Sequence, residues 1–214
     1  MSNLEQLIRK KRGRKSVRLS EPRISPLEKK EARKITNEML KNSEWDRLVK
    51  LLIEEPVYRA THALNIFSTM MKNKDLTMRF LMFNNHIMQH SSLPEREREL
   101  LILRNAWLSN SEYEWGQHIL IGAKVGLSND EINRIIEGPD AEEWNSFDST
   151  LLQAVDELHN DSFISNATWK ILAEKYNTNQ LMDLVFTVGC YHTMALAMNS
   201  FGVQLEKGRE SFPK

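Results

Sequence analysis

The sequence contains a single cysteine, Cys190, in 214 residues. One thiol excludes an intrachain disulfide and any redox cycle that needs two thiols in the same chain. On a helix Cys190 would lie almost opposite His192, so we interpret it as a packing residue and not as a nucleophile. This sparing use of cysteine suits a reducing cytoplasm.

Long apolar runs and a net charge are also missing from the sequence. No apolar run approaches the roughly 18 residues that a membrane span needs, and the N-terminus lacks the apolar region of a secretory signal. The 29 basic and 29 acidic residues cancel, which argues against a field that attracts nucleic acid or anionic lipid to the whole molecule. We therefore expect a soluble cytoplasmic protein that does not bind membranes.

Basic residues are concentrated at the N-terminus, where residues 1–23 have a net charge of +6 against −6 for the rest of the chain. Residues 1–24 also contain few large apolar side chains, and this composition predicts a flexible arm. A solvated tail is the simpler interpretation, and contact with nucleic acid is the lesser alternative. After the arm we predict one domain at 25–207 and a tail at 208–214.

Strand patterns are scarce, because no segment alternates apolar and polar residues for long enough. Helical periodicity dominates instead, in segments whose short connections make successive helices antiparallel neighbours. The sequence therefore predicts an all-α fold. The expected helices cover about 26–41, 44–55, 57–72, 76–90, 94–108, 112–125, 129–137, 146–159, 166–176 and 179–200.

Capping signals define several of these helix boundaries. Ser25–Pro26 predicts a helix start, since proline is favoured at the first helical position. Gly126 fits the left-handed residue that closes a helix, and Ser128 begins a capping box. Gly138–Pro139 stops the short helix that follows, and Ser165 caps a later one.

An ionisable pair lies on the apolar face of the helix predicted at 112–125. Glu114 and His118 are one helical turn apart, and residues four apart share a helix face. At about 100° per residue, their neighbours on this face are Ser111, Trp115, Ile121, Gly122 and Val125. The pair therefore points where a core-facing helix usually carries only carbon.

Glu99, on the preceding helix, is also predicted to point inward. It shares a face with Ile102, Leu103 and Ala106, whereas Arg98, Arg104 and Asn105 take other directions. A buried carboxylate needs a partner, and the antiparallel helix that follows offers His118.

Glu99, Glu114 and His118 then form one cluster across a helical hairpin. Such a cluster can transfer protons, because the imidazole relays a proton near neutral pH while a carboxylate orients it or acts as acid or base. A buried polar network that fixes the helix register explains the same pattern equally well. Both interpretations stay open on periodicity alone.

Other polar residues are weaker candidates. Tyr113, Trp115, His192 and Asn199 are predicted to contact a substrate, and the last two lie two helical turns apart on one helix. The pair His86 and His90 has a spacing that can bind metal. No motif supplies a third ligand, so we interpret them as satisfied or surface histidines and predict no metal site.

Several motifs recur in a combined pattern: LPEREREL at 93–100, LRNAW at 103–107, YEW at 113–115 followed by His118, and GLS at 126–128. This pattern resembles the carboxymuconolactone decarboxylase family, which includes the alkylhydroperoxidase D proteins. The likeness is strongest over about 80–137 and extends more loosely through 22–27 and 191–206. It implies a helical bundle built around an antiparallel hairpin, a homo-oligomer such as a trimer or hexamer, and a pocket without organic cofactor or metal.

The sequence also departs from part of that family. In the alkylhydroperoxidase branch, two cysteines precede the histidine in a Cys-x-x-Cys-x-x-x-His arrangement. By the resemblance, the positions of these cysteines are Ser111 and Glu114, and the position of the relay glutamate is Glu99. Peroxide reduction by paired thiols is therefore not expected here.

The decarboxylase branch needs no thiol, because a general acid protonates the dienolate that the loss of CO₂ leaves. The sequence thus predicts a cofactor-independent acid/base enzyme, decarboxylase-like or lyase-like, that acts on a small carboxylate or lactone-type molecule. His118, Glu99 and Glu114 are its predicted catalytic residues. An antioxidant relative without thiol chemistry and a non-enzymatic oligomeric binding protein are the alternatives.

Overall fold

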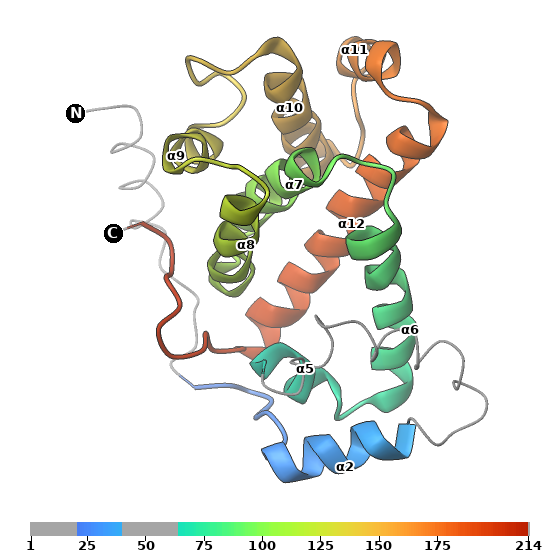
Figure 1. Ribbon diagram of the computed structural model, residues 1–214, viewed down its shortest axis with the longest axis vertical. Coiled ribbons are helices and arrows are strands. Elements are labelled where there is room, and N and C mark those ends of the chain that lie inside the picture. The colour runs from blue at the N-terminus through green and yellow to red at the C-terminus, as the bar shows by residue number, and fades with distance from the viewer. Residues whose placement is uncertain (1–20, 40–63, 214) are drawn as a thin grey trace. The chain divides into compact units, whose positions relative to one another are not determined.

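The computed structural model describes residues 21–39 and 64–213, and these ranges contain helices and no strand (Figure 1). The predicted all-α fold is therefore confirmed for this part of the chain. The helix predicted at 44–55 and most of the arm predicted at 1–24 lie outside the described residues.

The described chain forms two compact units. The large unit comprises residues 91–199 and 209–213, and the small unit comprises residues 21–39, 64–90 and 200–208. The large unit contains α7 (Glu95–Leu108), α8 (Glu112–Lys124), α9 (Asn129–Glu137), α10 (Ser146–Asp161), α11 (Asn166–Lys175) and nearly all of α12 (Thr178–Phe201). These bounds agree with the predicted helices to within two residues.

Helix α7 is the central helix of the large unit. Every side chain from Arg98 to Trp107 is buried, because α8, α9 and α10 all pack against it (Figure 1). Its leucines join Leu151 and Leu152 of α10 in the core. The short turn between α7 and α8 makes these two helices the predicted antiparallel hairpin.

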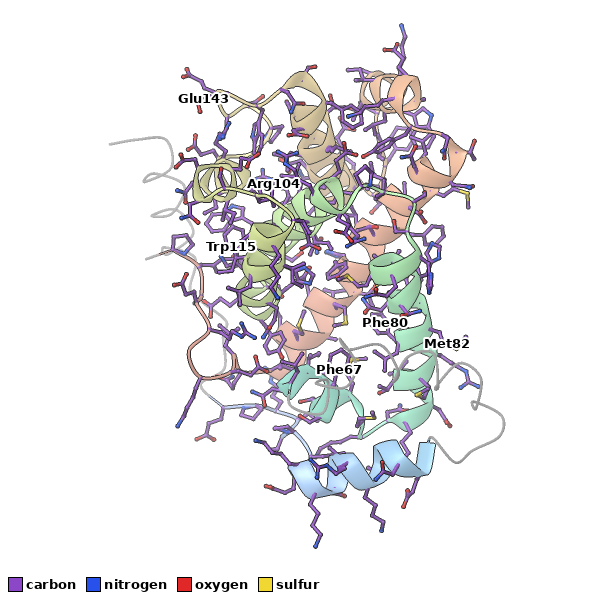
Figure 2. The ribbon with its side chains drawn as sticks, in the orientation of Figure 1. Phe67, Phe80, Met82, Arg104, Trp115 and Glu143 are labelled. Atoms are coloured by element: carbon purple, nitrogen blue, oxygen red, sulfur yellow. The ribbon has the colours of Figure 1, made fainter. Side chains whose placement is uncertain are left out.

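The residues of α7 that were predicted to face away from the Glu99 side are buried as well. Helical periodicity predicts a single inward face for each helix. Because other helices pack on several sides of α7, Arg98, Arg104 and Asn105 are buried as well. Arg104, which is labelled in Figure 2, is one of these enclosed groups, and its hydrogen bonds satisfy it. Its Nε and Nη2 donate to the two carboxylate oxygens of Asp156, each at 2.6 Å, and its Nη1 donates to two backbone carbonyls at the end of α9.

Local capping signals determine where the helices of the large unit begin and end. Gly126 closes α8 with a φ of +98°, and Ser128 forms the predicted capping box at the start of α9. Gly138 ends α9 with a φ of +107°, and the hydroxyl of Ser165 accepts the backbone N–H of Thr168 at the start of α11. These four predictions are confirmed.

Helix α12 is long and apolar enough to cross a membrane by length and composition, with a mean hydropathy of 1.4 in its most apolar window. Polar residues interrupt the apolar sequence of α12, so it was not predicted to be long and apolar enough to span a membrane. Its Leu184 and Val188 belong to the core of the large unit. Its buried Asp183 accepts hydrogen bonds from the backbone and hydroxyl of Ser92 at 2.6 and 2.7 Å. It therefore contributes to the core of the large unit.

The predicted tail at 208–214 contributes to the core. Phe212 packs edge-on against Trp107, with ring centroids 5.1 Å apart, and lies 5.5 Å from the ring of Trp115. The two tryptophans, one from each helix of the hairpin, are 5.9 Å apart. A C-terminal aromatic ring thus covers the side of the hairpin where the two tryptophans meet.

The small unit contains α2 (Lys29–Met39), α5 (Asn65–Met70), α6 (Lys74–Asn85) and a π-helix, η2 (His86–His90). Helix α2 begins at Lys29 and not at Pro26, so the predicted start was wrong. The reason is a backbone hydrogen bond of 3.1 Å from Leu27 N–H to the carbonyl of Ser68, which holds the residues before Lys29 against α5. The single helix predicted at 76–90 is divided into α6 and η2.

Gly138 offers a test of the packing around Arg104. A Cβ at Gly138 would lie 2.7 Å from Arg104 Nη2, whereas a Cβ at Gly126 would have no atom within 4 Å. Both residues have a positive φ, which costs about 1–2 kcal/mol for a residue with a side chain. We expect Gly138→Ala to lower the free energy of unfolding by more than Gly126→Ala does, measured by urea denaturation. Equal losses in the two variants would show that Arg104 is not held in place.

Candidate active site

The α7–α8 hairpin brings Glu99 and His118 into direct contact. Glu99 Oε2 lies 2.7 Å from His118 Nδ1, and the carboxylate is fully buried. A neutral imidazole that donates from Nδ1 to this carboxylate keeps Nε2 free of its proton, so the contact selects one tautomer. The inward direction predicted for Glu99 and its pairing with His118 are both confirmed.

Glu114 lies one helical turn before His118 and is also buried, with 2% of its surface exposed. Its Oε1 accepts a hydrogen bond of 3.2 Å from the amide nitrogen of Asn105, while its Oε2 has no hydrogen-bond partner within the described residues. Burial raises the pKa of Glu114 well above its usual range; the hydrogen bond from Asn105 opposes this and the charge on Glu99 adds to it. Burial therefore favours the neutral, protonated form of Glu114.

Tyr191 of α12 completes the cluster, although the sequence reasoning did not select it. Its ring packs edge-on against the ring of His118, with centroids 4.9 Å apart. Burial raises the pKa of Tyr191 well above its usual range, and the charge of Glu99 adds to the shift. Its phenol therefore remains protonated. A signal was present, since Leu184, Val188, Tyr191 and Ala195 share the buried face of α12.

Polar atoms without a hydrogen bond are concentrated around this hairpin. Buried polar atoms normally have a partner, yet within residues 21–39 and 64–213 six such atoms on α7, on α12, and on α8 with its preceding turn have none. They are Arg98 Nε, Glu99 Oε1, Asn105 Oδ1, Ser111 Oγ, Glu114 Oε2 and Thr187 Oγ1. The cluster thus has unused donors and acceptors beside a carboxylate–imidazole pair and a neutral acid, the groups that proton transfer requires.

The other predicted site residues lie in different surroundings. Tyr113 and Trp115 are buried, and Trp115 packs against Trp107. His192 Nδ1 lies 3.3 Å from Ser109 Oγ, and Asn199 donates to the Ser109 carbonyl at 2.9 Å. The hydrogen bonds of His192 and Asn199 thus go to the turn between α7 and α8 and not to the Glu99–His118 pair.

His86, His90 and Cys190 are the remaining candidates from the sequence. His86 and His90 are exposed on the π-helix of the small unit. No group of three or more His, Cys, Asp or Glu side chains in the described ranges is arranged to hold a metal ion. Cys190 is fully buried, as its interpretation as a packing residue predicts.

The part of the sequence that forms the α7–α8 hairpin is similar to a known protein family. Residues 75–143, which include the α7–α8 hairpin, match the model of the carboxymuconolactone decarboxylase family. No curated protein matches the sequence.

Solved structures share the fold at low sequence identity. An uncharacterized peroxidase-related protein from Silicibacter sp. TM1040 is 13% identical with a TM-score of 0.65, and the match covers 91% of this chain and 94% of that one. The alkylhydroperoxidase AhpD core of a peroxidase-related protein from Ralstonia eutropha JMP134 is 14% identical with a TM-score of 0.64, covering 76% and 86%. A debrominase in complex with 2,3,4-tribromopyrrole is 12% identical with a TM-score of 0.65, covering 86% and 91%.

The neutral state of Glu114 predicts a pH dependence of stability. Because the pKa is raised in the folded protein, that state binds the proton more tightly than the unfolded chain does. The wild type should therefore lose stability as the pH rises above the usual value of 4.5. Glu114→Gln cannot titrate, so its stability relative to the wild type should increase with pH, by up to about 1.4 kcal/mol per pH unit.

Urea denaturation between pH 4 and pH 8 measures this difference. Glu142→Gln, which removes an exposed carboxylate, is the control and should follow the wild type. Parallel pH profiles for Glu114→Gln and the wild type would mean that Glu114 is ionised in the folded protein.

Proposed function

We propose that the protein is a cofactor-independent acid/base enzyme, because residues 75–143 match the model of the carboxymuconolactone decarboxylase family and the fold is alkylhydroperoxidase D-like. Its substrate is a small carboxylate or lactone-type molecule, and its reaction is a decarboxylation or a related lyase step. The observation that carries this proposal is the buried 2.7 Å contact between Glu99 and His118 beside the neutral Glu114. The likeness in fold to a debrominase supports an enzymatic role.

Each of the three residues has a distinct part in the proposed reaction. Loss of CO₂ breaks a carbon–carbon bond and leaves its electron pair in a dienolate, which needs a proton on carbon. His118 transfers this proton, and Glu99 holds the imidazole through Nδ1. Glu114 supplies a proton because burial keeps it neutral. Two carboxyl groups in different surroundings, one against an imidazole and one against an amide, can thus take different roles.

The same site does not support thiol chemistry. By the family resemblance, Ser111 and Glu114 take the positions of the two cysteines of the alkylhydroperoxidase branch. Cys190 is fully buried on α12. A buried thiol in the core is not available to a peroxide. An antioxidant function, which the peroxidase-related proteins of similar fold suggest, would therefore need a different mechanism here.

We also propose that the protein works as a cytoplasmic homo-oligomer, such as a trimer or hexamer. One face of α12 leaves three large apolar side chains more than half exposed: Met182 at 55%, Phe186 at 52% and Leu196 at 58%. Exposed apolar side chains grouped on one helix support a contact surface.

Replacement of the predicted catalytic residues tests the acid/base proposal. On a panel of small carboxylates and lactones, His118→Gln and Glu99→Gln should reduce kcat about 10²- to 10⁴-fold, the contribution that a positioned proton-transfer group makes. His90→Gln is the matched control, since His90 is exposed on η2, and should keep wild-type turnover. A His118→Gln variant that is folded by circular dichroism and turns substrate over at the wild-type rate would contradict the proposal.

A peroxidase assay tests the antioxidant alternative. With hydrogen peroxide and a dithiol reductant we expect no consumption above the uncatalysed rate, and the same result for Cys190→Ser, because the thiol is enclosed by the core. Robust peroxide consumption that disappears in Cys190→Ser would instead assign thiol chemistry to this chain.

A further inference from the structure

Three arginines lie on the central helix α7, and two of them form hydrogen bonds with carboxylates of neighbouring helices. Arg96 donates to the carboxylates of Glu131 and, at 2.8 Å, Asp148. Arg104 forms the double contact with Asp156 and binds two backbone carbonyls. In this helix an enclosed guanidinium is thus normally matched by carboxylates from neighbouring helices.

Arg98 differs from both. It is 5% exposed, yet its guanidinium makes no hydrogen bond to any residue in the described ranges, and its Nε is buried without a partner. The carboxylate oxygen in ion-pair range is Glu99 Oε1 at 3.9 Å, which is beyond hydrogen-bond distance. Glu99 cannot serve Arg98 as Asp156 serves Arg104, since its other oxygen is held by His118. A buried guanidinium that makes no hydrogen bonds has N–H donors that an anion can accept from.

Arg98 also belongs to the candidate active site. Its Nε lies 3.9 Å from Glu99 Oε1, and its charge acts on the phenol of Tyr191. Tyr191 in turn packs against His118. The unused donors of Arg98 are therefore in the same group of residues as the proposed proton-transfer pair.

We propose that Arg98 is the residue that anchors a carboxylate of the substrate, through two parallel N–H···O hydrogen bonds from its guanidinium. This inference rests on the proposed function, which it deepens by naming the residue that selects the substrate. The planar fork of a guanidinium matches the two oxygens of a carboxylate. A doubly charged phosphate fits less well, because the carboxylate of Glu99 already lies 3.9 Å from Arg98 Nε.

The anchored carboxylate is not the group that reacts. An interaction that is equally strong before and during the reaction contributes to binding and not to kcat, and a tight ion pair would hold back a carboxylate that has to leave as CO₂. The proposed substrate therefore carries one carboxylate for Arg98 and a separate reactive group for His118. Loss of Arg98 should accordingly raise KM more than it lowers kcat.

Binding of benzoate and of its neutral analogue benzamide tests the anchor without requiring turnover. By isothermal titration calorimetry, the wild type should bind benzoate more tightly than benzamide. Arg98→Gln should weaken benzoate binding roughly 10- to 100-fold, as expected for lost hydrogen bonds to a charged group, and leave benzamide binding unchanged. Arg98→Lys should bind benzoate with intermediate affinity, because it keeps the charge and loses the fork.

Lys124→Gln is the matched control, since it removes one positive charge from the exposed end of α8. It should bind benzoate like the wild type. Equal affinity of the wild type for benzoate and benzamide, no measurable binding of either, or unchanged benzoate binding in Arg98→Gln would each overturn the anchor. If Arg98→Gln does not fold, the comparison of the two probes on the wild type still decides. Benzoate binding that depends on Arg98, in a protein without turnover on the substrate panel, would retain the anchor and reject only the enzymatic proposal.

Discussion

The large unit depends on enclosing a helix that is rich in polar side chains. A buried polar group without a partner destabilises the fold, so each one on α7 constrains the helix opposite. Arg104 requires Asp156 of α10 and the last carbonyls of α9, and Glu99 requires His118 of α8. These contacts therefore set how three helices lie around α7. They also determine which polar groups are left for a ligand. The guanidinium of Arg104 makes four hydrogen bonds, whereas the guanidinium of Arg98 has only Glu99 Oε1 at 3.9 Å within the described residues.

Local sequence was sufficient for most of the fold because helix ends are local events. The left-handed Gly126 and Gly138 and the capping box at Ser128 involve residues a few positions apart, so their effect can be derived from the sequence alone. The start of α2 could not be predicted in this way. Its position depends on a hydrogen bond between Leu27 and Ser68, two residues that are distant in the sequence.

The same contrast between local and long-range contacts explains which residues of the candidate site could be predicted from the sequence. Glu99 and His118 belong to one hairpin with a short turn, so helical periodicity was enough to place them together. Arg98 was missed because periodicity assigns a helix one inward face, whereas α7 is enclosed on several sides. Tyr191 comes from α12, and its alignment with the hairpin follows from the tertiary packing of the whole unit. His192, its neighbour, was selected instead, but it turns toward Ser109.

The contact of Phe212 with Trp107 and Trp115 has a practical consequence. These two indoles are buried, and they come from the two helices of the α7–α8 hairpin. Their fluorescence emission is therefore sensitive to separation of α7 from α8 and to release of the C-terminal segment. The protein thus carries an intrinsic optical probe of the element that holds its candidate active site.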